Sequence, residues 1–77
     1  MIMKKYSIKN NVRKLRFEHN EMTQQQLAEQ VNVTRQTIVA IEKNKYSPSL
    51  ELAFKIAQVF HTPLEKIFSF EEIDKGS

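Results

Sequence analysis

Residues 23–42, TQQQLAEQVNVTRQTIVAIE, constrain the fold of this chain more than any other segment. Thr23 is followed three residues later by Gln26, the pattern of a capping box that starts a helix. We expect that helix to end at Asn32, since asparagine tolerates the left-handed backbone conformation that a sharp turn needs. Thr34 is a suitable N-cap for a second helix. The segment therefore predicts two short helices joined by a tight turn.

The apolar residues of this segment fit the same interpretation. Two helices that cross at a steep angle need a small side chain where they approach most closely, and Ala28 provides one. Larger apolar side chains recur at helical spacing on both sides of the turn. We expect them to fill the crossing: Leu27, Val31, Val33, Ile38 and Ile41.

The rest of the chain is also predicted to be helical. One glycine and two prolines leave few places where regular structure can break. Apolar spacing predicts three further helices, at residues 11–19, 49–60 and 63–68. Thr62, Pro63 and Glu65 supply an N-cap, a first-position proline and a capping-box acid in succession, which marks the start of the last helix.

The two ends of the chain carry β-forming residues with some alternation. Residues 5–9 and 68–73 could pair as a short antiparallel ribbon. We therefore expect an all-α fold with five helices, to which this ribbon is an optional addition. The 77 residues have room for one domain, with its core at about residues 11–68.

Composition excludes several classes of function. Cysteine is absent and only two histidines occur, so we expect neither disulfides nor a metal site. A nucleophile with a base partner, a phosphate-binding glycine loop and a paired-acid site are all missing, so we expect neither enzymatic activity nor a cofactor. No run approaches the roughly 18 apolar residues of a membrane span, and a cytoplasmic protein without membrane association is expected.

Charge divides unevenly along the chain. Residues 1–64 hold ten Lys and Arg against five Glu, whereas residues 65–77 hold two Lys against three Glu and one Asp. The first part therefore attracts polyanions and the second does not. We expect the C-terminal side to face away from a nucleic acid.

About residues 11–68 resemble the lambda-repressor and Cro class of helix-turn-helix regulators, also called the XRE family. The motifs that carry the resemblance are LR at 15–16, MTQQQLA at 22–28, VNVTRQTI at 31–38, IE at 41–42 and KYSPSLELAFKIA at 45–57. Two features depart from the family pattern. Asn32 stands where glycine is usual, and the loop FEHNEM is one residue longer than usual.

The resemblance implies a five-helix, lambda-repressor-like DNA-binding domain. Its third helix would be the recognition helix in the major groove, and its second would lie across the phosphate backbone. An ion pair between Arg16 and Glu42 is implied as a structural feature. The possible ribbon and the KYxPSL and PLExIF patterns also resemble very small members of this class, such as the cytolysin-operon regulators.

Side chains at the start of the predicted recognition helix are the candidates for base contacts. Gln36 can form paired hydrogen bonds with adenine, and Arg35 can do so with guanine. A phosphate contact remains an equal alternative for Arg35, because at least half of protein–DNA hydrogen bonds go to the backbone. Val39 and Ala40, one turn later, could touch thymine methyl groups.

Polar residues around this helix are the candidates for backbone contacts. Gln24 lies in the first turn of the preceding helix, where amides and the helix dipole suit a phosphate. The others are Thr34, Thr37, Lys43, Asn44, Lys45, Tyr46 and Ser47. Thr34 could instead act only as a cap, and Tyr46 could serve packing.

These features predict a sequence-specific transcriptional regulator, more often a repressor, that binds double-stranded DNA as a homodimer. A pseudo-palindromic operator would then have half-sites about 34 Å apart. Four apolar residues could belong either to the core or to the dimer interface: Leu64, Ile67, Phe68 and Phe70. An antitoxin or another protein-interaction module that docks an unknown protein partner is the alternative function.

Overall fold

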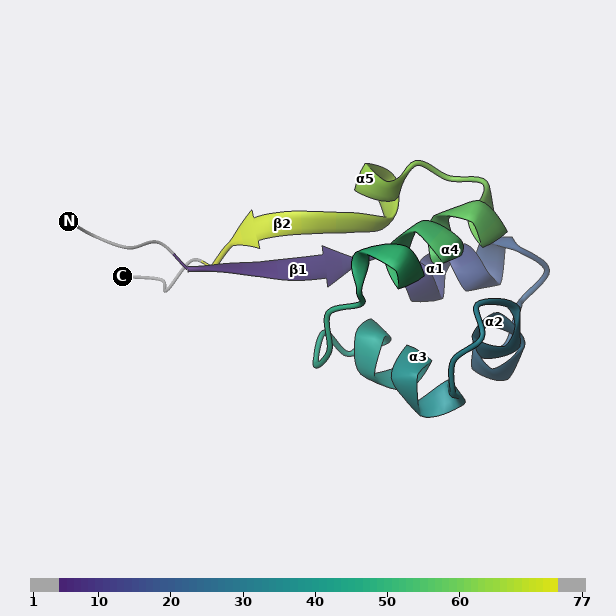
Figure 1. The fold of residues 1–77 in the computed structure, drawn as a ribbon. Coiled ribbons are helices and arrows are strands. Elements are labelled where there is room, and N and C mark those ends of the chain that lie inside the picture. The colour runs from purple at the N-terminus through teal and green to yellow at the C-terminus, as the bar shows by residue number, and fades with distance from the viewer. Residues whose placement is uncertain (1–4, 74–77) are drawn as a thin grey trace.

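The computed structural model describes residues 5–73, which form five helices and a two-stranded antiparallel ribbon (Figure 1). In chain order the elements are β1 (Tyr6–Asn10), α1 (Val12–Glu18), α2 (Gln24–Gln30), α3 (Arg35–Glu42), α4 (Leu50–Phe60), α5 (Leu64–Ile67) and β2 (Phe68–Glu72). The predicted five helices and the terminal ribbon are both confirmed. None of the described helices, of which α4 is the longest with 11 residues, is long and apolar enough to cross a membrane.

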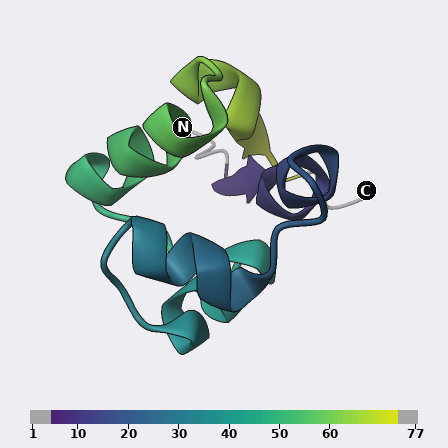
Figure 2. The same ribbon diagram turned by 90° about the vertical axis from the view of Figure 1, so that its right-hand side faces the viewer.

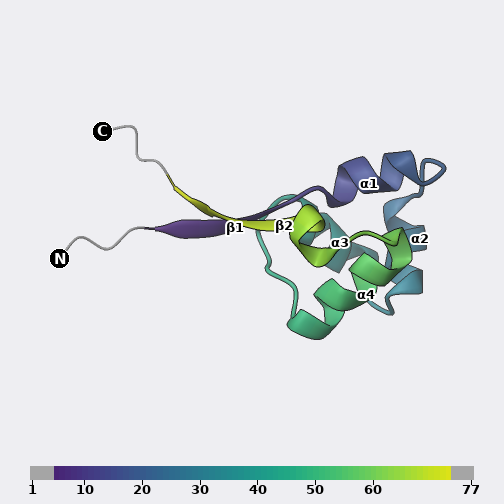
Figure 3. The same cartoon turned by 90° about the horizontal axis from the view of Figure 1, so that it is seen from above.

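The ribbon extends away from the helices, as the view from above shows (Figure 3). Ile8 of β1 lies opposite Phe70 of β2, and Asn10 lies opposite Phe68. Tyr6 stacks on Phe70 with ring centroids 4.8 Å apart and planes 11° apart. Side chains at alternate positions share a face, so the ribbon gathers its aromatic side chains on one side.

The cap and the turn of residues 23–42 form as predicted. The Thr23 hydroxyl accepts a hydrogen bond from the Gln26 amide at 3.0 Å, and the Gln26 side chain accepts one from the Thr23 amide at 2.8 Å. Asn32 adopts a left-handed conformation with φ of 61°. The chain then turns back, and the Val33 amide donates to the Ala28 carbonyl at 3.0 Å.

The predicted start of α5 is wrong, because Thr62 does not cap this helix and Pro63 occupies the N-cap rather than the first helical position. His61 is left-handed, with φ of 51°, and the Thr62 amide donates to the Ala57 carbonyl. The Thr62 hydroxyl donates to the Phe60 carbonyl at 2.9 Å. Thr62 therefore completes the end of α4, and Pro63 precedes α5 without a side-chain cap.

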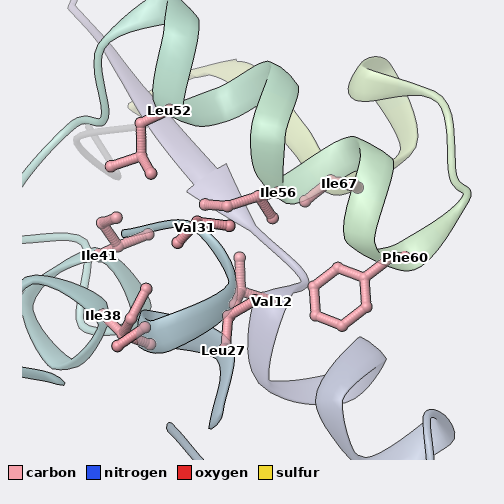
Figure 4. Close-up of a cluster of buried hydrophobic side chains, with 10 residues drawn as sticks. Val12, Leu27, Val31, Ile38, Ile41, Leu52, Ile56, Phe60 and Ile67 are labelled. Atoms are coloured by element: carbon pink, nitrogen blue, oxygen red, sulfur yellow. The ribbon is translucent and has the colours of Figure 1, made fainter. Parts of the chain in front are cut away.

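Apolar side chains from all five helices meet in a single core (Figure 4). Figure 2 shows α4 across the body from α2 and α3, with α1 along one side. The buried members are Val12, Leu27, Ala28, Val31, Ile38, Ile41, Leu52, Ile56, Phe60 and Ile67. Ile67 is only 1% exposed. This burial assigns Ile67 to the core and removes it from the candidate dimer interface.

Candidate nucleic-acid interface

Helix α3 is held by its inner face and presents its outer face to solvent. Ile38 and Ile41 are buried in the core, 0% and 1% exposed. The Thr34 hydroxyl accepts a hydrogen bond from the Thr37 amide at 3.3 Å, which caps the helix, and lies 3.1 Å from the Thr37 hydroxyl. A helix fixed in this way presents the side chains of its first turn at a defined angle.

The four candidate base-contact residues lie on that outer face. Arg35 and Gln36 are exposed, whereas Val39 and Ala40 are half-buried. Within residues 5–73, neither Arg35 nor Gln36 forms a hydrogen bond or an ion pair through its side chain. Both polar groups are therefore available to an external partner, as readout of base edges requires.

A buried ion pair joins the end of α3 to α1. Arg16 Nε donates to Glu42 Oε2 at 2.6 Å, and Nη2 donates to Oε1 at 3.0 Å. A third guanidinium nitrogen, Nη1, donates to the Met22 carbonyl at 2.8 Å. The two side chains are only 10% and 7% exposed. The pair that the family resemblance implied is thus present, and it has the bidentate geometry that makes Arg–carboxylate contacts strong.

Gln24, a candidate phosphate contact, also joins this network. Its side-chain amide donates to Glu42 Oε1 at 3.1 Å, and the residue is half-buried. One of its two amide hydrogens is therefore engaged within the protein. The other remains for an external acceptor.

The segment after α3 is exposed throughout its candidate backbone-contact residues: Lys43, Asn44, Lys45, Tyr46 and Ser47. Asn44 has a left-handed backbone with φ of 58°, which lets the chain leave the helix sharply. Its Oδ1 accepts a hydrogen bond from Asn10 Nδ2 at 3.0 Å. The segment is therefore tied to the ribbon.

Asn10 is a residue whose role the sequence did not reveal. Its Nδ2 also donates to the Ile41 carbonyl at 2.8 Å, and its Oδ1 accepts from the Val12 amide at 3.1 Å. One side chain thus joins the end of β1, the start of α1 and the end of α3. An asparagine just before a helix signals a cap, but nothing in the sequence signals the two long-range contacts.

An apolar hollow lies between α4, α5 and the ribbon. Phe54 is 51% exposed and Phe70 is 69% exposed, large fractions for aromatic side chains. Ile8, Leu64 and Phe68 also line the hollow. Three of the four candidate interface residues therefore gather here, and Phe54 joins them. The spacing of apolar residues in α4 was the available signal for Phe54, but it does not distinguish core from surface.

Comparison with known proteins identifies the family. The helix-turn-helix family matches residues 12–67. The chain is 52% identical over 65 residues to an uncharacterized HTH-type transcriptional regulator of Methanocaldococcus jannaschii, covering 84% of this chain and 97% of that protein. It is 49% identical over 65 residues to one from Archaeoglobus fulgidus, covering 84% and 90%.

A bacterial relative is similar to nearly the same extent. The uncharacterized HTH-type transcriptional regulator YgzD of Bacillus subtilis is 48% identical over 65 residues, which cover 84% of this chain and 97% of that protein. The capping box of α2, the exposed Arg35 and Gln36 at the start of α3 and these similarities all indicate the same family. The chain belongs to the XRE-type helix-turn-helix family of DNA-binding transcriptional regulators.

Proposed function

We propose that this protein is a sequence-specific repressor that acts in the cytoplasm and binds a pseudo-palindromic operator as a homodimer. One observation carries the proposal: Arg35 and Gln36 are exposed and unpaired, within the described residues, on a helix whose far end is held by the Arg16–Glu42 pair. Unengaged polar side chains on a rigid helix suit base readout.

Sequence would be read by the first two turns of α3 in the major groove. Gln36 can donate to adenine N7 and accept from its N6 amino group with a suitable amide orientation, and Arg35 can donate to guanine O6 and N7. Val39 and Ala40 lie one turn further on and present small apolar groups to thymine methyls. Two polar base-contacting side chains per subunit, Arg35 and Gln36, specify only a few base pairs. This favours a dimer that binds two half-sites.

Position on the DNA would come from the polar residues that surround α3. Lys43 and Lys45 supply positive charge beyond its end, and their side chains are exposed. The remaining donors are the Gln24 amide, the Thr34 and Thr37 hydroxyls, Asn44, Tyr46 and Ser47. Such contacts orient the protein without reading sequence.

The apolar hollow supports the homodimer. It is lined by Phe54, Leu64, Phe68 and Phe70, and in Figure 1 α5 and β2 lie on the opposite side of the molecule from α3. A second copy could cover these side chains without obstructing α3. Residues 65–77 carry a net negative charge, which also favours a position away from DNA.

Repression would require fewer additional protein surfaces than activation would. A bound dimer excludes other proteins from the DNA that it covers, whereas activation needs a further surface that contacts the transcription machinery. The exposed side chains of α3 support DNA binding and the apolar hollow supports self-association, and repression by exclusion would need no further surface.

The deciding experiment selects DNA from random oligonucleotides and then compares variants on the selected operator. Gln36→Ala should reduce operator affinity by about 1–3 kcal/mol and leave nonspecific binding nearly unchanged. Gln58→Ala, which alters an exposed glutamine on α4, is the matched control and should change neither. Selection of no sequence, or an equal loss on all sequences with Gln36→Ala, would contradict sequence-specific readout by α3.

A further inference from the structure

A second hollow lies between α1, the start of α2 and the outer face of α3. Arg13 and Phe17 of α1 line it together with Arg35, Val39 and Lys43. Phe17 is 54% exposed, so it contributes little to the core. The hollow shares Arg35 and Val39 with the proposed base-contact face, which makes the two surfaces continuous.

Positive charge predominates in this hollow. Arg16 and Glu42 also line it, but they neutralise each other in the buried pair. Three cations, Arg13, Arg35 and Lys43, then face one acid, Glu21. Within residues 5–73 none of the three cations forms an ion pair. An excess of unpaired guanidinium and ammonium groups suits a polyanion.

Phe17 gives one of these cations a defined place. The Arg13 guanidinium carbon lies 5.7 Å from the centroid of the Phe17 ring, and the Arg16 guanidinium carbon lies 5.9 Å from it. Arg13 precedes Phe17 by four residues on α1, so the two side chains are neighbours on one helix face. A guanidinium held by a ring face keeps its N–H donors for an anion.

We propose that Arg13, positioned by Phe17, contacts the DNA backbone next to the groove that α3 enters. The DNA contact would thus extend from α2 and α3 onto α1. This inference rests on the proposed function, because it places a phosphate beside the same operator. An extended polyanion is favoured over a small anion, since the unpaired cations come from two helices and one of them belongs to the base-contact face.

The test is the salt dependence of operator binding for Arg13→Gln. Removing one phosphate neutralisation should make the slope of log Kobs against log salt concentration shallower by about 0.9, hence by about 1.8 for a dimer. Lys14→Gln is the matched control, because Lys14 is the adjacent exposed cation and does not line the hollow. The slope of log Kobs against log salt concentration for Lys14→Gln should equal that of the wild type.

Phe17→Leu tests the positioning role, since leucine keeps an apolar side chain but provides no ring for the cation. Its slope should also become shallower, with the thermal unfolding midpoint little changed. An unchanged slope for Phe17→Leu overturns the positioning role. An unchanged slope for Arg13→Gln, or an equal change for Lys14→Gln, overturns the α1 contact. The proposed function survives that result if Gln36→Ala still loses discrimination, and both fail if the wild type binds no selected DNA.

Discussion

Arg16 and Glu42 are 26 residues apart in sequence, yet two hydrogen bonds of 2.6 and 3.0 Å join their side chains. The Met22 carbonyl and the Gln24 amide satisfy further polar atoms of the same pair. A buried ion pair is favourable only when its geometry is good and its remaining polar atoms are satisfied. This network meets both conditions and holds the end of α3 at a set distance from α1 and α2.

Breaking this pair should strongly destabilise the domain. Glu42→Ala leaves the Arg16 charge buried without its partner, and we expect a loss of about 3–5 kcal/mol in the free energy of unfolding. Urea denaturation measures the loss. Lys55→Ala is the control, because it removes the exposed pair with Glu51 and should cost about 0.5 kcal/mol or less. Similar losses for the two variants would show that the buried pair has no special role.

Local chemistry made much of the fold predictable. The Thr23 capping box and the left-handed Asn32 depend on residues within a few positions, and both occur as expected. The longer loop before α2 was visible in sequence, but its conformation was not. It closes through left-handed residues at both Asn20 and Glu21, with φ of 59° and 53°, and glutamate has no strong preference for that region.

Contacts across long stretches of sequence were the part that could not be predicted. Asn10 forms hydrogen bonds with Ile41 and Asn44, which lie 31 and 34 positions later in the chain. These hydrogen bonds depend on where the ribbon packs against the helices. Helix α5 has four residues, too few for periodicity to separate the buried Ile67 from the exposed Phe70 that follows. Of the candidate base contacts, Arg35 and Gln36 are exposed while Val39 and Ala40 are half-buried, and the roles of all four toward DNA remain predictions.

Removing the Asn10 side chain should loosen the joint between the ribbon and α3. Asn10→Ala leaves the Ile41 carbonyl and the Val12 amide without this partner, and we expect a loss of about 1–3 kcal/mol in stability. Lys9→Ala, an exposed change in the same strand, provides the comparison. Equal unfolding midpoints in urea for the two variants would show that the three Asn10 hydrogen bonds add no stability.

Thr34→Asp separates the capping role of Thr34 from its proposed place beside a phosphate. Aspartate caps helices at least as well as threonine, so thermal unfolding should be little changed. A negative charge about 4 Å from a phosphate should weaken operator binding by about 1–4 kcal/mol. Gln58→Asp adds the same charge at an exposed site of α4 that belongs to no proposed DNA contact, and it should leave binding nearly unchanged. Equal binding by both variants would leave Thr34 as a cap alone.

Phe54→Ser tests whether the apolar hollow is the dimer interface. Full burial of an exposed phenylalanine contributes about 1.5–3 kcal/mol, but Phe54 is only 51% exposed before association. Each copy can therefore gain about half of that, and a symmetric dimer that loses two such side chains should weaken by about 1.5–3 kcal/mol. Every 1.4 kcal/mol is about tenfold in Kd, so sedimentation equilibrium should show a shift of at least about tenfold. Phe17→Ser is a close control, because Phe17 is 54% exposed against 51% for Phe54 but lies outside this hollow. Equal dimer dissociation constants for Phe54→Ser and Phe17→Ser would place the dimer interface elsewhere.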